Sequence, residues 1–386
     1  MQPSATRTPP TARPARLDSI AQARQIVLHE RAPASNGLVA PWIERSWQRC
    51  LAIGHTPGQT VGFDPLGAAQ AKRVMNSNRA LTDAARPALQ DLGRALADTR
   101  YFAILTNAQG VVVDVNGPID RSDRRADLIT RIGVDLSESC VGTTAIGAAL
   151  TELQPVWLHR GEHFFNDTSG YSCAGAPLFG PDGVCVGMLD MTGVDAPERP
   201  ELTHLVVQSA RHIENSLALC QSHALLLRLN WPGCRLGENN DGLVGLDDDG
   251  FVTTCNSAAR QLLPQLGLVP GNNSHRTHAS ELFAVPASLL FDAVQAPATI
   301  LDLPLWSGLR LQALVAPAGG PREGPAAWNT MVGAVPPARD PRRLRDIETA
   351  LIRKAVEDAR GNVALAAQQL GVSRATVYRK LGIKRG

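Results

Sequence analysis

The chain has 386 residues, of which 44% are hydrophobic, 19% charged and 4% aromatic. Because a single hydrophobic core stops growing at roughly 250 residues, this length predicts two or three domains with mainly aliphatic cores. Every stretch of about 18 residues contains a charged side chain, and the N-terminus has no apolar run, which argues against a secreted or membrane-spanning protein. The composition therefore predicts a cytoplasmic protein.

The charge is unevenly distributed along the chain. Residues 341–386 carry 11 Lys and Arg against 4 Asp and Glu, a net charge of +7, which leaves −5 on the remainder. A polyanionic partner is therefore expected at the C-terminus. The seven cysteines are scattered and form no C-x-x-C pair, as is typical of reduced thiols in the cytosol.

The first 80 residues of the chain change from an aperiodic to a helical pattern. Residues 1–16 mix Pro, Thr, Ala and Arg without periodicity, which predicts a disordered arm. Residues 17–80 predict a helical region, broken by the Gly and Pro cluster at 54–58.

Residues 81–222 predict an antiparallel sheet flanked by helices. Short β-rich runs alternate with turn signals, and three segments have the pattern of a helix. The strands are expected at 101–106, 111–115, 155–159, 175–179 and 184–190, and the helices at 81–96, 143–150 and 201–227.

A smaller unit of the same kind is expected at residues 236–300. Two apolar runs flank the acidic turn DDDG at 247–250, and a helix follows at 257–263. Residues 301–340, which become rich in Gly, Pro and Ala, predict a flexible linker. Residues 341–386 then predict an all-helical unit, so the chain as a whole is an α+β multidomain protein.

The C-terminal unit has the pattern of a helix-turn-helix. Amphipathic helices are expected at 346–360 and 363–370, and Gly371 permits the sharp turn after them. Ser373 can cap a third helix, in which Arg374, Thr376 and Arg379 are expected to contact bases in the major groove. Phosphate contacts are expected from Asn362, Ser373, Tyr378, Lys380, Lys384 and Arg385.

These patterns also resemble a known family. The stretch GNVALAAQQLGVSRATVYRKL at 361–381 closely resembles the Fis-type helix-turn-helix of bacterial enhancer-binding regulators, which implies a homodimer on inverted half-sites of double-stranded DNA. Residues 41–220 are similar to the N-terminal half of acetoin-catabolism-type regulators, which implies a GAF domain. The matching pieces are at 45–50, 142–147, 161–164, 173–177 and 187–190, and residues 236–300 resemble a PAS domain through DGLVGLDDDGFVTTCN.

The GAF resemblance implies an unknown small-molecule effector bound between the sheet and the loops on one face. The loop 160–177 is the expected rim, with His163, Tyr171 and Cys173 as candidate ligand contacts. A purely structural role for their polar groups stays open. No cofactor, metal or catalytic residue is implied.

One expected feature of such regulators is missing from the sequence. It contains no Gly-Lys pair and hence no Walker A loop for the central ATPase that acts on sigma-54 RNA polymerase in relatives. We therefore expect a ligand-responsive regulator that works by DNA binding, occlusion or recruitment of RNA polymerase. The alternative is an architectural DNA-binding protein or a dominant-negative partner of a full-length sigma-54 activator.

A zinc-dependent enzyme is the more remote alternative. His159 to His163 have the H-x-x-E-H spacing of inverted zinc proteases. Gly161 interrupts the helix that would place both imidazoles on one face, so we do not expect an enzyme.

Overall fold

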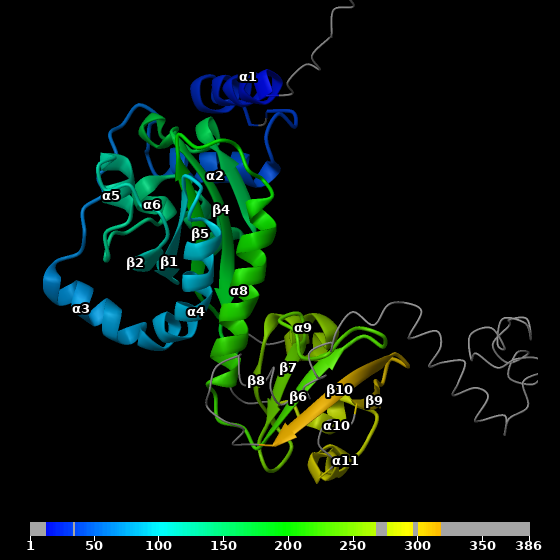
Figure 1. Ribbon diagram of the computed structural model, residues 1–386. Coiled ribbons are helices and arrows are strands. Elements are labelled where there is room, and N and C mark those ends of the chain that lie inside the picture. The colour runs from blue at the N-terminus through cyan, green and yellow to red at the C-terminus, as the bar shows by residue number, and fades with distance from the viewer. Residues whose placement is uncertain (1–12, 34, 268–275, 296–299, 318–386) are drawn as a thin grey trace, which may run out of the picture. The chain divides into compact units, whose positions relative to one another are not determined.

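The computed structural model describes residues 13–317 except 34, 268–275 and 296–299 (Figure 1). These residues belong to one unit of the chain, which runs to residue 325, and they form two five-stranded sheets. The predicted helix-turn-helix, with all its DNA-contact candidates, lies outside the described residues. Within the described part, no helix combines the length and apolarity needed to span a membrane.

The first sheet has the strand order β2-β1-β5-β4-β3, and all neighbouring strands are antiparallel. This confirms the antiparallel sheet that the sequence predicts, although β4 begins earlier and β5 ends later than expected. The strands are β1 (Tyr101–Asn107), β2 (Val112–Asn116), β3 (Val156–His159), β4 (Tyr171–Phe179) and β5 (Cys185–Val194).

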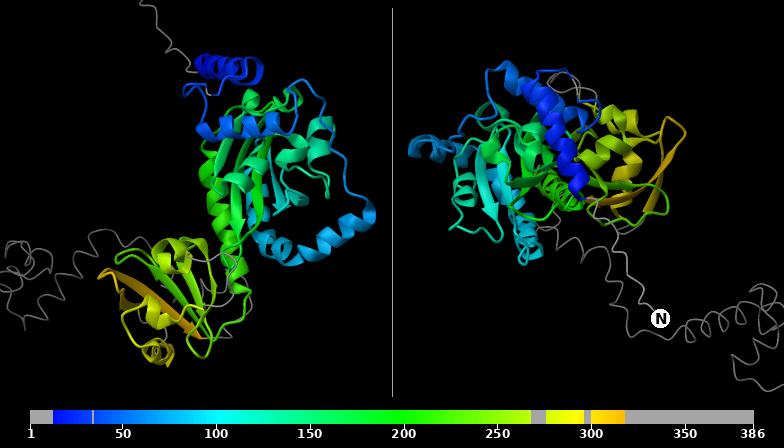
Figure 2. Two further views of the ribbon diagram at one scale, coloured as in Figure 1. Left: turned by 180° about the vertical axis from the view of Figure 1, so that it is seen from behind. Right: turned by 90° about the horizontal axis from the view of Figure 1, so that it is seen from above.

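Helices cover both faces of this sheet (Figures 1 and 2). Because successive side chains of a strand point to opposite faces, Leu189 and Met191 join the core beneath α4 and α8, whereas Met188 joins the core beneath the helices on the other face. The first face carries α4 (Arg79–Ala95) and α8 (Leu202–Leu219), and the second carries α5 (Arg124–Ile129), α6 (Glu138–Val141) and α7 (Ala145–Glu152).

The N-terminal helices form a core of their own against the loop after β3. Trp47 is fully buried there and shares an apolar cluster with Ile20 and Phe164. Helix α1 begins at Arg13, so the predicted disordered arm is wrong for residues 13–16; Arg16 is held by ion pairs to Glu162 and Glu198. The elements are α1 (Arg13–Arg24), the π-helical turn η1 (Gln25–His29), α2 (Pro41–Ala52) and α3 (Ala68–Ser77).

The second sheet has the order β8-β7-β6-β10-β9, again with antiparallel neighbours. Its elements are β6 (Leu225–Asn230), β7 (Gly242–Leu246), β8 (Val252–Cys255), α9 (Ser257–Leu262), the 3₁₀ turn η4 (Pro264–Gly267), α10 (Ala279–Leu282), α11 (Ala287–Asp292), the 3₁₀ turn η5 (Ala293–Gln295), β9 (Ile300–Pro304) and β10 (Arg310–Pro317).

Three strands of this sheet correct the sequence predictions. The helix expected at 201–227 ends at Leu219, and the leucines that follow form the central strand β6. The linker expected from residue 301 starts too early, because β9 and β10 occupy 300–304 and 310–317. Leu311, Ala313 and Val315 alternate into the core, as half-buried strands require. The predicted bounds of the second unit, 236–300, therefore left out β6, β10 and almost all of β9.

Polar side chains join α8 to the second sheet. Asn256 caps α9 by accepting from the Ala259 amide at 2.8 Å, and its own amide donates to Asn215 Oδ1 of α8 at 2.7 Å. Glu214, the neighbouring residue of α8, accepts from the Phe179 amide of β4 at 2.9 Å.

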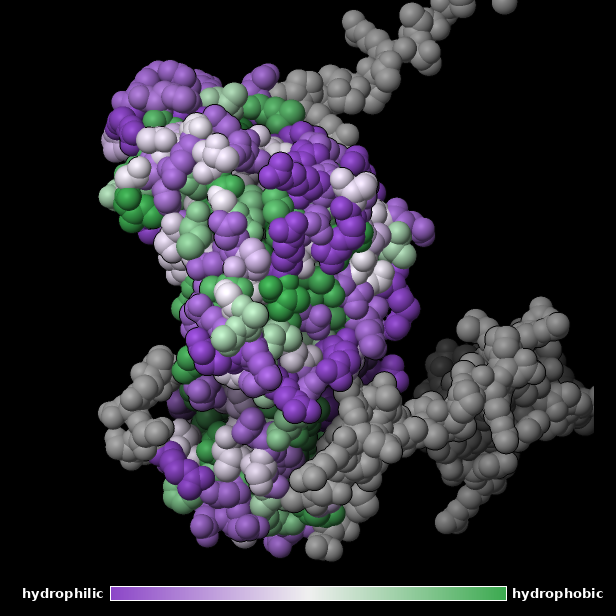
Figure 3. All heavy atoms as spheres, turned by 90° about the vertical axis from the view of Figure 1, so that its left-hand side faces the viewer, coloured by the Kyte–Doolittle hydropathy of each residue, from purple (hydrophilic) through white to green (hydrophobic). Residues whose placement is uncertain are grey.

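Hydrophilic side chains cover most of the face in Figure 3, and apolar residues lie between them in small groups.

Gly187 of β5 lies where a larger residue has no space. A Cβ atom would lie 2.2 Å from the Thr106 carbonyl oxygen and 3.0 Å from Leu81 Cδ2. We call the first sheet with the helices that cover it the first domain. We expect Gly187→Ala to destabilise this domain by about 2 kcal/mol or more, which lowers its melting temperature by several degrees. Gly58→Ala is the matched control, since no atom lies within 4 Å of its Cβ position. Equal melting temperatures for the two variants would contradict the packing described.

Candidate functional site

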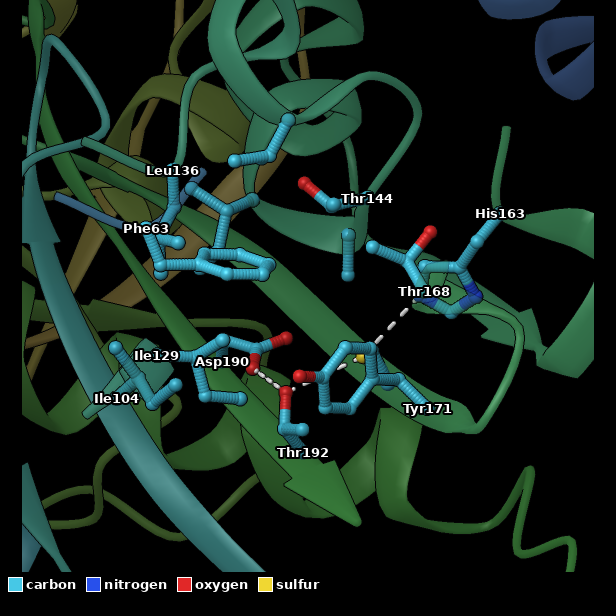
Figure 4. Close-up of a pocket in the computed structure, with 14 residues that line it drawn as sticks. Phe63, Ile104, Ile129, Leu136, Thr144, His163, Thr168, Tyr171, Asp190 and Thr192 are labelled. Atoms are coloured by element: carbon cyan, nitrogen blue, oxygen red, sulfur yellow. Dashed lines mark hydrogen bonds between the residues drawn. The ribbon is translucent and has the colours of Figure 1, made fainter. Parts of the chain in front are cut away.

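A mostly apolar cavity lies between the first sheet and the helices α5, α6 and α7 (Figure 4). The unfilled space within the cavity and in its opening to solvent together is about 350 Å³. It contains all three candidate contacts that the sequence predicts on the 160–177 loop. The lining residues are Phe63, Ile104, Ile129, Leu136, Val141, Thr144, Ala145, Ile146, His163, Thr168, Tyr171, Cys173, Asp190 and Thr192.

His163 and Cys173 face each other in the cavity wall. The imidazole Nδ1 lies 2.9 Å from the Arg160 carbonyl oxygen, and Nε2 lies 3.5 Å from Cys173 Sγ. Burial lowers the pKa of His163 to about 4 and raises the pKa of the Cys173 thiol well above its ordinary value. Both groups are therefore neutral near pH 7, with Nδ1 donating to the carbonyl and Nε2 available to accept from the thiol.

Tyr171 closes the same side of the cavity. Its hydroxyl donates to the Arg125 carbonyl oxygen at 3.2 Å, and its ring meets the edge of His163 with centroids 6.2 Å apart. Burial raises the pKa of this phenol, so it stays protonated at physiological pH. The three predicted residues are thus brought together, and each has a partner within the protein.

Asp190 of β5 is the polar residue of the cavity that the sequence analysis did not select. The side chain is buried; Oδ2 accepts from the Thr192 hydroxyl, and Oδ1 has no hydrogen-bond partner among the described residues. In Figure 4 this second oxygen points toward the middle of the lining side chains. Burial raises the pKa of Asp190 to about 7. A carboxylate within an otherwise apolar strand was the available sequence signal.

The loop that carries His163 is held by the N-terminal helices. Arg24 of α1 donates to the carbonyl oxygens of His163 at 2.5 Å and Phe164 at 3.1 Å. The Trp47 indole of α2 donates to the Glu162 carbonyl oxygen at 2.9 Å. These bonds satisfy buried carbonyl groups and fix one wall of the cavity.

The two motifs at 45–50 and 142–147 lie close together in space. Ser46 hydrogen-bonds to Thr143 at 2.7 Å, and Arg49 forms ion pairs with Glu138 at 2.6 Å and Glu152 at 3.1 Å. Helix α2 is thereby fixed to α6 and α7, which form the roof of the cavity.

The geometry does not form the zinc site that the H-x-x-E-H spacing suggested. His159 Nδ1 hydrogen-bonds to Ser172 Oγ at 2.8 Å, whereas His163 Nε2 faces Cys173. The Glu162 carboxylate is paired with Arg16. Residues 13–317, where described, contain no group of three His, Cys, Asp or Glu side chains placed to hold a metal ion.

A helix-covered antiparallel sheet with a cavity on one face is the GAF-type fold that the sequence predicts. Residues 19–215 match the sequence model of the MimR N-terminal domain, and the chain belongs to this family. Residues 343–382 match the model of bacterial regulatory proteins of the Fis family. That match includes Asn362 and the contact candidates from Ser373 to Lys380, while Lys384 and Arg385 lie beyond it.

Known regulators are similar to this chain over parts of their length. It is 33% identical over 246 residues to the acetoin catabolism regulatory protein of Cupriavidus necator, covering 59% of this chain and 35% of that protein. It is 29% identical to the propane 2-monooxygenase operon transcriptional activator MimR of Mycolicibacterium goodii, covering 46% and 30%. The similarity thus spans about a third of these relatives.

A solved structure similar to this chain is the Escherichia coli DhaR(N)–DhaL complex. The sequence identity is 17% and the TM-score is 0.44, with 72% of this chain and 100% of that chain covered. The two relatives from Cupriavidus necator and Mycolicibacterium goodii are transcriptional regulators, and this confirms the family resemblance that the sequence motifs indicated.

Asp190 should make the stability of the first domain depend on pH. Its pKa of about 7 in the folded state lies above the ordinary value of 3.8, so the folded protein binds the proton more tightly and loses stability as pH rises from about 4 to 7. We expect Asp190→Asn to be more stable than the parent protein above pH 7, by on the order of a few kcal/mol, and this gain to vanish toward pH 4.

The measurement is thermal or urea unfolding of both proteins across this pH range. Asp98→Asn is the control, because Asp98 is an exposed carboxylate just before β1 that does not line the cavity. A stability difference for Asp190→Asn that is the same at every pH would contradict the assignment.

Proposed function

We propose that this protein is a ligand-responsive, sequence-specific DNA-binding transcriptional regulator. The observation that carries the proposal is the Fis-family match at 343–382, in a C-terminal segment with 11 basic against 4 acidic residues. Such a charge supplies the affinity for phosphates, and a helix in the major groove supplies selectivity. The named relatives, which regulate acetoin catabolism and a propane 2-monooxygenase operon, support the same function.

The proposed regulator acts without an ATPase of its own. The 386 residues contain no Gly-Lys pair and therefore no Walker A loop. We infer that it binds as a homodimer to inverted half-sites in the cytoplasm and acts by occluding or recruiting RNA polymerase.

The cavity of the first domain is the proposed effector site. His163, Tyr171 and Cys173 form one wall, and Arg24 and Trp47 hold the loop that carries His163. The loop that carries His163 can change its position relative to α1 and α2 only if the ligand binds one position of the loop more tightly than the other. Contacts from α8 connect this domain to the second sheet.

The proposal predicts distinct roles for basic residues of the C-terminal segment. We expect Arg374→Ala and Arg379→Ala to reduce the preference for the selected operator over random DNA by about tenfold each, because each removes a base contact. Lys384→Ala should weaken binding to both DNAs equally and flatten the salt dependence, because it removes a phosphate contact.

The experiment uses the full chain in two stages. Selection from a randomised oligonucleotide pool first identifies the operator, and binding titrations at several salt concentrations then compare the variants. Failure to enrich any sequence would favour an architectural DNA-binding protein instead. Equal selectivity in all three variants would overturn the assignment of the base contacts.

A further inference from the structure

We propose that a buried polar junction couples the two sheets, so that they open and unfold as one cooperative unit. The junction consists of Glu214 and Asn215 on α8, the turn 180–183 between β4 and β5, and Asn256 and Arg260 at α9. Stabilisation of the first domain, whatever its cause, is then shared by the second sheet, which goes beyond the proposed function.

The turn between β4 and β5 bonds directly to the second sheet. The Pro181 carbonyl oxygen accepts from the amide of Cys255, the last residue of β8, at 3.3 Å. The Gly180 carbonyl oxygen accepts from Arg260 Nη2, also at 3.3 Å. Because the turn is itself closed by a bond of 2.8 Å from the Gly180 amide to the Val184 carbonyl oxygen, it cannot bend away from β8 without losing hydrogen bonds.

Arg260 is held in place by residues at the start of α9. Its Nη1 donates to the Cys255 carbonyl oxygen at 3.1 Å, and its Nη2 lies 3.3 Å from Ser257 Oγ. A guanidinium that is already fixed loses little further freedom when it bonds to another group. The bond from Arg260 to the Gly180 carbonyl oxygen therefore forms at a low entropic cost.

Glu214 brings a buried carboxylate of the first domain to the same place. It is 5% exposed, and it accepts from the Phe179 amide at the end of β4 at 2.9 Å. Burial raises the pKa of Glu214, whereas Ser257 and Arg260 beside the second sheet oppose this shift. The charge of this carboxylate is thus stabilised by groups from both sides of the junction.

Asn215 and Asn256 form the neighbouring contact, and both side chains are buried. Asn215 Oδ1 accepts from Asn256 Nδ2 at 2.7 Å, and Asn215 Nδ2 donates to the Asn239 carbonyl oxygen at 3.0 Å. Asn256 Oδ1 in turn accepts from the amides of Leu243 in β7 and Ala259 in α9. Since a partly broken buried network leaves unsatisfied groups, opening one sheet would disrupt the other.

The hairpin that ends in this turn also carries part of the cavity wall. Tyr171 and Cys173 lie on β4, and Asp190 and Thr192 lie on β5. The two strands pair from these residues to the turn. If the cavity is the effector site, as proposed above, a ligand that stabilises the first domain would also stabilise the second sheet.

The test is hydrogen exchange of the full chain, followed by mass spectrometry for peptides from β5 and β6, the central strands of the two sheets. The slowest amides exchange only when their cooperative unit opens. We expect Gly187→Ala, which destabilises the first domain, to speed the slowest exchange at least tenfold in both peptides, and Gly58→Ala to change neither. Unchanged exchange in β6 would overturn the proposal. Val113→Ala, a milder truncation in β2, replaces Gly187→Ala if that variant does not fold.

The role of the junction is tested in a double variant, Arg260→Met with Asn215→Ala. It removes bonds between the sheets but keeps the aliphatic stem at 260 and the cap that Asn256 provides for α9. In this background we expect Gly187→Ala to speed exchange at least tenfold in β5 and less than threefold in β6. Each single variant is measured as well and should weaken the shared response.

Arg310→Met is the matched control, because Arg310 pairs with Asp302 within the second sheet at 2.7 Å. It should leave the shared response intact. Equal acceleration of β5 and β6 in the junction variants, or loss of the shared response in Arg310→Met, would overturn the role of the junction. The measurement needs neither effector nor DNA, so its failure leaves the proposed regulator function standing, and failure to select an operator leaves the coupling standing.

Discussion

Strand β5 is buried on both faces, and this constraint determines where polar groups of the first domain can lie. Its side chains alternate between the core beneath α4 and α8 and the core beneath α7. A carboxylate on such a strand loses nearly all its hydration, and the Thr192 hydroxyl restores only one hydrogen bond to Asp190. Unfavourable burial of this kind tends to occur at functional sites, where another group compensates for it.

The need of buried carbonyl groups for hydrogen-bond donors explains why the N-terminal helices belong to the domain. The sheet edge at β3 leads into a loop whose carbonyl groups have no strand to pair with. Arg24, buried enough that its pKa is lowered, supplies donors to that loop, and Trp47 adds another. The cavity wall is therefore assembled from segments more than 100 positions apart in the sequence.

The second sheet is connected to the first domain through α8. Glu214 and Asn215 are neighbours on this helix, yet one bonds to the backbone of β4 and the other to Asn256 beside β8. Buried polar contacts of this kind specify a geometry closely, because each broken bond leaves an unsatisfied group. Helix α8 thus joins β4, the strand that carries Tyr171 and Cys173, to the second sheet.

Local signals in the sequence were sufficient for much of the architecture. The turn at 107–110 and the β-rich runs beside it specify the β1–β2 hairpin, since turn chemistry and strand propensity depend mainly on adjacent residues. The motifs at 45–50, 142–147 and 361–381 identified the family. The GAF resemblance also placed the rim of a ligand site at 160–177, and its candidates His163, Tyr171 and Cys173 line one cavity.

The tertiary structure alone decided the features that depend on distant partners. The leucines at 225–227 suit a helix or a buried strand equally, and only pairing with β7 and β10 makes them a strand. The strands at 300–304 and 310–317 likewise need their neighbours in the sheet. Asp190 is notable only because α7 and the sheet exclude water from it; burial and hydrogen-bond satisfaction are properties of the whole fold, which no local pattern contains.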